Sequence, residues 1–163
     1  MKKLIAMMLA VLMLCALTAC SENPGTSTTT TPPPAEGFTF TYQGVALTPG
    51  AQFDAASLPQ VESFENPNCA GEGKFITYMH DAMELTVNVI GDKTVIFSIY
   101  LTDANTATAE GLHLGDDVAR ISELYGQGTI SDDGESIAFT KGASQLLVMV
   151  DAETVSSIEY RLA

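Results

Sequence analysis

The sequence is poor in basic residues, and this shortage excludes one large class of functions. Seven Lys and Arg residues stand against twenty Asp and Glu, which gives a formal net charge of −13 at pH 7. A surface of this charge repels nucleic acid phosphates, so we exclude nucleic-acid binding. The acidic residues are dispersed rather than grouped in one block, so they do not form an acidic tail. Acidity by itself names no partner.

Histidine and cysteine are also scarce, which limits the catalytic and metal chemistry that the chain can carry. The sequence has two histidines, His80 and His113, and three cysteines. A Ser-His-Asp triad needs a histidine oriented by a buried carboxylate, and a zinc site needs three or four ligands. We expect neither, and we expect His80 at an exposed hairpin tip. The one enzymatic alternative is a small envelope hydrolase that uses Cys69 or His113.

No apolar run is long enough to span a bilayer. The longest covers residues 4–17, whereas a span needs about 20 residues. Lys2 and Lys3 precede it, and Leu17-Thr18-Ala19-Cys20 closes it. A basic start, a short apolar region and a small-residue cleavage site are typical of a secretory signal.

The cysteine directly after this site resembles the lipobox of bacterial lipoproteins. The resemblance implies that residues 1–19 are a cleaved signal peptide and that Cys20 carries a lipid. It also implies a mature chain anchored to the cell membrane and facing outside the cytoplasm. The alternative is an ordinary signal peptide with a chance cysteine. With Cys20 lipidated and Cys15 removed, Cys69 alone remains, so the mature chain has no intramolecular disulfide.

Cys69 itself shows no sign of reactivity in its sequence context. Residues 66–72 contain no cation that would favour a thiolate. We therefore interpret Cys69 as a small buried residue or an inert loop thiol.

Residues 20–37 are predicted to be the lipidated cysteine followed by a disordered tether. Residues 21–37 are rich in Thr and Pro and contain no large apolar residue, so burial cannot offset the entropy of ordering them. In extended polyproline geometry, at about 3.1 Å per residue, the tether would reach roughly 50 Å. A single folded domain is predicted over residues 38–163.

An internal repeat suggests how that domain is built. Strands are predicted at residues 75–78, 85–89 and 96–101, and again at 137–139, 146–150 and 155–160, after an initial hairpin that turns at Gln43-Gly44. A short helix is predicted before each set of three strands. The predicted fold is therefore α+β, with two tandem helix-plus-three-strand repeats at about 47–103 and 111–163. Their strands form an antiparallel sheet with short helices on one face.

The second helix has the clearer signals. Asp116 is predicted to cap it, Val118, Ile121 and Leu124 to form its apolar face, and Gly126 to end it. The first helix is predicted around Phe53 and Ala56, ending at Pro59. One core shared by both repeats is expected, with eight buried residues: Phe53, Leu85, Val87, Ile99, Val118, Ile121, Leu146 and Val148.

The repeat unit carries a family resemblance. A helix opened by Leu112-His113-Leu114-Gly115-Asp116 and closed by Leu124-Tyr125-Gly126, followed by three strands, resembles the repeat of the beta-lactamase inhibitor protein and the SmpA/OmlA envelope lipoproteins. The resemblance implies a concave antiparallel sheet with helices on its back. The sequence has no Trp, so the aromatic-rich face of the inhibitor is not evident and inhibitory activity does not carry over. The chain is also similar to uncharacterised lipoproteins of anaerobic Gram-positive bacteria, which imply no activity.

One acidic loop remains open to interpretation. Asp132, Asp133 and Glu135 offer enough oxygens for calcium but lack the spacing of a helix-loop-helix site, so either a solvated turn or a calcium site fits the sequence. We expect no cofactor, no metal site and no catalysis. The predicted function is a lipid-anchored extracytoplasmic module that binds an envelope protein or another ligand. The sequence names neither the partner nor the oligomeric state.

Overall fold

The computed structural model describes residues 36–69 and 71–163. The chain begins there with a small hairpin of β1 (Phe40–Tyr42) and β2 (Val45–Leu47). Gln43 and Gly44 connect the strands with φ angles of 49° and 83°, the left-handed conformation that two-residue hairpin turns require. This hairpin and its turn confirm the prediction from the alternating residues.

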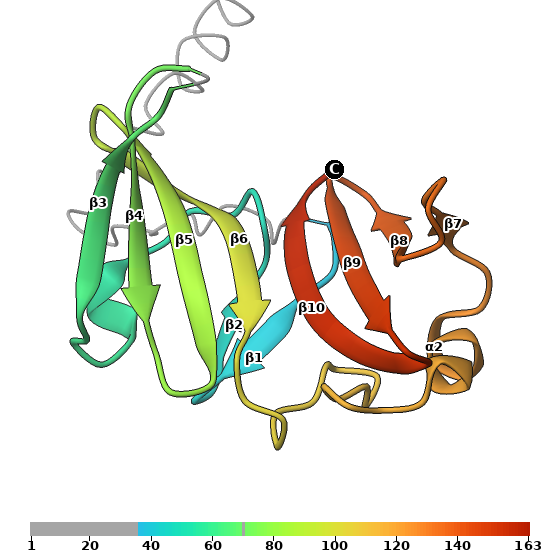
Figure 1. Ribbon diagram of the computed structural model, residues 1–163. Helices are drawn as coiled ribbons and strands as arrows, with labels where there is room; N and C mark the ends of the chain where they lie inside the picture. The colour runs from blue at the N-terminus through green and yellow to red at the C-terminus, as the bar shows by residue number, and fades with distance from the viewer. Residues whose placement is uncertain (1–35, 70) are drawn as a thin grey trace, which may run out of the picture. The chain divides into compact units, whose positions relative to one another are not determined.

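All other strands form one antiparallel sheet of eight strands (Figure 1). Their order is β3-β4-β5-β6-β10-β9-β8-β7, so two four-stranded meanders meet where β6 pairs with β10. The first meander consists of β3 (Ser63–Pro67), β4 (Lys74–Met79), β5 (Met83–Ile90) and β6 (Lys93–Leu101). The second consists of β7 (Thr129–Ile130), β8 (Ser136–Lys141), β9 (Ser144–Asp151) and β10 (Thr154–Leu162). The six strands predicted from the sequence correspond to β4–β6 and β8–β10.

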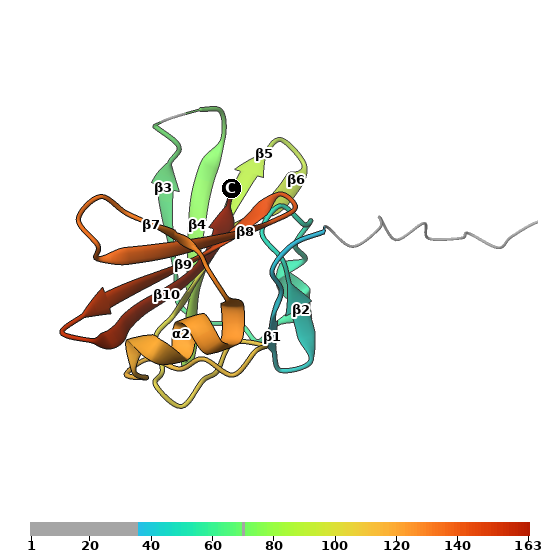
Figure 2. The same ribbon diagram turned by 90° about the vertical axis from the view of Figure 1, so that its right-hand side faces the viewer.

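The two meanders pair over a short stretch only. β6 and β10 share three residue pairs, centred on Ile99 and Tyr160. Nearer the start of β6, residues 50–53 and not β10 form the hydrogen bonds to its edge. There, the Gly50 amide donates to the Ile96 carbonyl at 2.8 Å, and the Phe53 amide donates to the Thr94 carbonyl at 2.9 Å. The meanders therefore diverge from their junction, and Figure 2 shows the strands of one running across those of the other.

The structure contains a single α-helix among the described residues, α2 (Val118–Tyr125). Its N-cap is Asp117, whose carboxylate accepts the Ala119 amide at 2.8 Å, and not Asp116 as predicted. Asp116 lies one residue before the N-cap position, and its carboxylate accepts a hydrogen bond from the His113 amide at 2.8 Å instead. Gly126 ends the helix at φ 74°, as predicted.

The predicted α+β fold with two helix-plus-three-strand repeats is wrong. The fold is mostly β, and the first predicted helix is only a turn of 3₁₀-helix, η1 (Ala55–Ser57), with no buried residue. It cannot extend toward its N-terminus because residues 50–53 are engaged with β6. Each half also has a fourth strand, β3 or β7, that the sequence pattern did not reveal. All five residues of β3 and both residues of β7 are exposed. Because neither strand buries a face, neither needs the alternation of apolar and polar residues by which a strand is recognised in a sequence.

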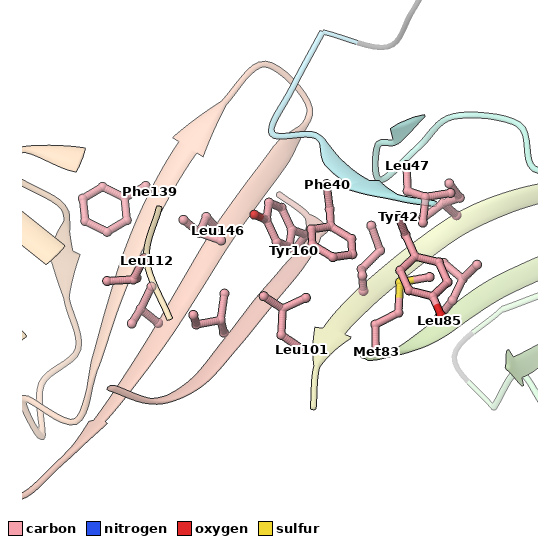
Figure 3. Packing of buried hydrophobic residues seen from close by; sticks show 14 of the residues in the cluster. Phe40, Tyr42, Leu47, Met83, Leu85, Leu101, Leu112, Phe139, Leu146 and Tyr160 are labelled. Carbon is pink, nitrogen blue, oxygen red and sulfur yellow. The ribbon is translucent and has the colours of Figure 1, made fainter. Parts of the chain in front are cut away.

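The core lies on one face of the sheet (Figure 3). The β1–β2 hairpin, α2 and the connecting segments cover this face, with Phe40 packing on Tyr160 at a ring-centroid distance of 5.8 Å. Of the eight residues predicted to be buried, Phe53 and Val118 are only partly buried. The other six are confirmed as buried: Leu85, Val87, Ile99, Ile121, Leu146 and Val148.

No helix among the described residues has the length and apolarity needed to cross a membrane. The predicted signal peptide, Cys20 and nearly all of the predicted tether lie outside the described residues.

Candidate functional site

Cys69 and His113, the residues of the hydrolase alternative, lie at opposite ends of the sheet. Cys69 is exposed in the β3–β4 connection, where its sulfur lies 3.8 Å from the Pro67 carbonyl. His113 follows the end of β6, and its Nδ1 lies 3.6 Å from an Asp116 carboxylate oxygen. Because β6 begins at the end where β4 begins, its own end is the opposite one. The fold therefore does not bring the thiol and the imidazole together.

His80 is buried, which corrects its predicted exposure at a hairpin tip. The hairpin exists between β4 and β5, but only 7% of the His80 side chain is accessible. The β1–β2 hairpin covers it, with the Tyr42 ring 5.3 Å away. Burial lowers the pKa of His80, against a smaller opposing effect of the Asp81 carboxylate. Its Nδ1 has no hydrogen-bond partner within residues 36–69 and 71–163, so His80 packs beneath the hairpin with no carboxylate bound to this nitrogen.

The acidic loop between β7 and β8 is a turn held by its own side chains. Asp133 accepts hydrogen bonds from the Ser131 hydroxyl and from the Glu135 amide, the latter at 3.0 Å. These bonds hold the pKa of the Asp133 carboxyl below its usual value. Across the described part of the chain, no three His, Cys, Asp or Glu side chains gather as metal ligands.

The main candidate is the face of the sheet opposite the core, which we call the open face. Side chains alternate between the two faces of a strand, so the neighbours of the core residues point to this side. Four of its large apolar side chains are between 39% and 51% exposed: Phe64, Phe97, Tyr100 and Met149. Large exposed apolar side chains that share one face of a sheet mark it as a candidate interaction surface.

Polar side chains lie between these apolar side chains in two rows, each made of residues that pair across neighbouring strands. In the first row, the hydroxyls of Thr77 and Thr86 lie 3.0 Å apart, and Arg161 donates to Gln145 at 2.7 and 2.9 Å. In the second row, Tyr100 lies between Glu84 on β5 and Glu159 on β10. The exposed phenol therefore has a carboxylate on each side.

A groove of about 620 Å³ opens on the first meander of this face. The Phe75 and Phe97 rings line it, with centroids 4.7 Å apart. The Asn88 side chain also lines it, with a buried Oδ1 that has no hydrogen-bond partner among the described residues. The lining also includes Ile90, Lys93, Val95 and Leu162. An apolar hollow with a few fixed polar groups is typical of a binding site.

The groove depends on a β-bulge that the sequence did not reveal. Thr86 pairs with Ser98 and Val87 pairs with Ile96, so Phe97 is an extra residue that turns toward the open face. Large apolar residues occur at both odd-numbered and even-numbered positions of β6, so alternation alone could not assign Phe97 to one face of the sheet. The signal present in the sequence was the three-residue spacing of the core residues Ile96 and Ile99 within a strand.

A second hollow, of about 530 Å³, lies beside α2. It is lined mainly by aliphatic side chains such as Ile130 and Ile137, together with Phe139, and contains no charged residue. It therefore gives less chemical guidance than the groove on the open face.

Comparison with known protein families, with curated proteins and with solved structures found no match. Function must therefore be inferred from the site itself.

Proposed function

We propose that this chain is a lipid-anchored interaction module that faces outside the cytoplasm and presents its open face to an envelope partner. The observation that carries the proposal is the uncovered apolar and aromatic surface of Phe64, Phe97, Tyr100 and Met149. Tyr is among the residues that contribute most to protein interfaces, because it combines large apolar area with a polar group. The sequence of Cys20 and the residues before it supports the anchor.

The chemistry of the open face favours a partner with a basic side chain. Glu84 and Glu159 flank the exposed Tyr100 ring across β5, β6 and β10. A Lys or Arg of the partner would be attracted to the ring face and to Glu84, and it would compete at Glu159 with Arg161, whose Nη1 lies 3.9 Å from that carboxylate. The strongly acidic chain would also speed the encounter with a basic surface.

A binding role without catalysis is the simpler proposal for this geometry. An enzyme needs nucleophile, base and orienting group in one place. Cys69 and His113 lie at opposite ends of the sheet, and His80 is packed beneath the β1–β2 hairpin.

Site-specific photo-crosslinking in the native host tests the proposal. A photoreactive phenylalanine analogue would replace Tyr100 in the full chain, and the matched control would carry it at Glu123, an exposed residue of α2 that does not line the second hollow. We expect a crosslinked product of defined mass from position 100 and none from position 123. The same products from both positions, or none from position 100, would contradict an interaction through the open face.

A further inference from the structure

The N-terminal part of the chain joins the sheet at one defined end. The Glu36 carbonyl accepts the Ala143 amide at 3.4 Å, and the Phe38 amide donates to the Ser144 hydroxyl at 2.6 Å. These contacts fix residue 36 beside the β8–β9 turn. The C-terminus lies at the same end, because the Ala163 amide donates to the Ala143 carbonyl at 3.0 Å. We call the strand ends nearest these termini the proximal end and the opposite strand ends the distal end; because the meanders cross, their distal ends point in different directions (Figure 2).

Basic residues gather at the proximal end. Of the five Lys and Arg residues in the described chain, only Arg120 lies elsewhere, on α2. The other four occupy the proximal ends of four strands: Lys74 begins β4, Lys93 begins β6, Lys141 ends β8 and Arg161 lies one residue before the end of β10. Four carboxylates lie in the same region, on Glu36, Glu65, Glu72 and Asp92, and Glu65 pairs with Lys74 at 2.6 Å, so charge at this end is nearly balanced.

The connections at the distal end are strongly acidic, and Arg120 is the one basic residue of the described chain close to them, because the start of α2 is joined to the β9–β10 turn by a hydrogen bond from the Val118 amide to the Glu153 carbonyl at 2.9 Å. The connections there are β4–β5, β6–α2, β7–β8 and β9–β10, and none contains a Lys or Arg. Their acidic residues are Asp81, Asp103, Glu110, Asp116, Asp117, Asp132, Asp133, Glu135 and Glu153.

Exposed apolar side chains also mark the proximal end. Ile90 ends β5 and is 45% exposed, and Leu162 ends β10 and is 39% exposed. Both line the groove of the open face, together with Lys93. Apolar side chains beside Lys and Arg are typical of protein surfaces that rest in the interfacial region of a bilayer.

We propose that the proximal end rests on the bilayer to which the chain is anchored, with Ile90 and Leu162 in the lipid interface and the acidic distal end directed away. This inference rests on the proposed lipid anchor at Cys20. An anchor at Cys20 would hold the domain close to the bilayer at a high effective concentration, so even a weak contact with the bilayer would be populated.

Charge separation makes this orientation preferable to its inverse. In the first meander, strands of eight or nine residues, at about 3.3 Å per residue, place the two ends roughly 27 Å apart, and the six-residue β8 places its own ends roughly 20 Å apart. Both separations are more than twice the Debye length of about 8 Å at physiological ionic strength. With the proximal end on the bilayer, the distal carboxylates are screened from lipid charge. In the inverse orientation they would lie against it.

The absence of tryptophan from the sequence allows a direct test. Two single-tryptophan variants of the full lipidated protein, Ile90→Trp and Ile130→Trp, would be reconstituted into vesicles containing brominated phosphatidylcholine. Ile130 is the matched control because it is an exposed isoleucine on β7, next to the distal β7–β8 turn. We expect brominated lipid to reduce the tryptophan emission of the Ile90→Trp protein at least twofold and to leave that of the Ile130→Trp protein unchanged.

Flotation of the same vesicles separates failure of this inference from failure of the anchor. If the proteins float but emission from position 90 is unquenched, or both positions are quenched equally, the proposed orientation is wrong and the anchor stands. If the proteins do not float, the anchor is wrong and the orientation fails with it. Should Ile90→Trp not fold, as judged by circular dichroism, Leu162→Trp replaces it with the same expectation.

Discussion

Phe75 and Phe97 form an aromatic pair on the open face, with ring centroids 4.7 Å apart, although their chain neighbours Ile76 and Ile96 point toward the core. The pair lies outside the main core and exists because the bulge at Phe97 brings this ring next to the one on β4. We attribute its position to the proposed binding role rather than to stability.

Replacing Phe97 with Ala should therefore have a small effect on folding. An aromatic pair contributes about 0.5–1.5 kcal/mol, and Phe97 is 39% exposed, so we expect a loss of about 1 kcal/mol in the free energy of unfolding measured by urea denaturation. Ile99→Ala is the control, because Ile99 lies two residues away and is fully buried; it should cost about 2–4 kcal/mol. Equal losses in the two variants would assign Phe97 to the core.

The two meanders should unfold as one unit. Their core is continuous across the β6–β10 junction, where Tyr160 and Ile99 are both fully buried. Ile121→Ala should cost about 2–4 kcal/mol and reduce hydrogen-exchange protection in β5 and β9 by the same factor. Separate melting transitions, or a stably folded fragment of residues 111–163, would refute a shared core.

Membrane retention should depend on Cys20. A signal followed by a lipidated cysteine anchors the chain through its acyl groups, and two or more chains are needed for stable retention. In the native host, Cys20→Ala should move the protein from the membrane fraction to the soluble fraction after an alkaline wash. Cys69→Ala is the matched control and should stay in the membrane fraction. A Cys20→Ala protein that remains with membranes would contradict the lipobox interpretation.

The free energy of unfolding should decrease as the pH is lowered through the range in which a histidine of the unfolded chain becomes protonated. Burial holds the pKa of His80 below the usual 6.5, so just below pH 6.5 the unfolded chain binds a proton that the folded chain does not. The free energy of unfolding should therefore decrease as pH falls from 7.5 to 5.5, and it should gain nothing from His80 above that range. His80→Phe should reduce this slope. The control for losing a histidine as such is His113→Phe, and an unchanged slope in His80→Phe would show that His80 is not the group responsible.

Cys69 should be dispensable. Its side chain is exposed and contacts only its own loop within the described residues, so Cys69→Ser should keep the melting temperature within about 2 °C of the wild type. The wild-type thiol should react with a neutral alkylating reagent at the rate of an ordinary exposed cysteine. Much faster labelling, together with a loss of stability in Cys69→Ser, would point to a structured and activated thiol.

The sequence located what short-range interactions control. The β1–β2 turn at Gln43-Gly44 and the end of α2 at Gly126 both follow from positive φ angles that a few neighbouring residues specify. Strands with one buried face were equally predictable, because β5 and β9 alternate clearly between buried and partly exposed residues. The core positions Leu85 and Leu146 follow from the same alternation.

Tertiary structure decided the features that join distant parts of the chain. Residues 50–53 form edge contacts with β6 instead of a helix, because the divergence of β10 leaves that edge free. His80 is buried because a hairpin about forty residues earlier covers it, and Phe97 faces outward because of a bulge whose register is set by β5. The gathering of Lys74, Lys93, Lys141 and Arg161 at one end depends on strand direction in the assembled sheet. None of these outcomes is encoded by local periodicity, since each requires a contact between segments that only the complete sheet brings together.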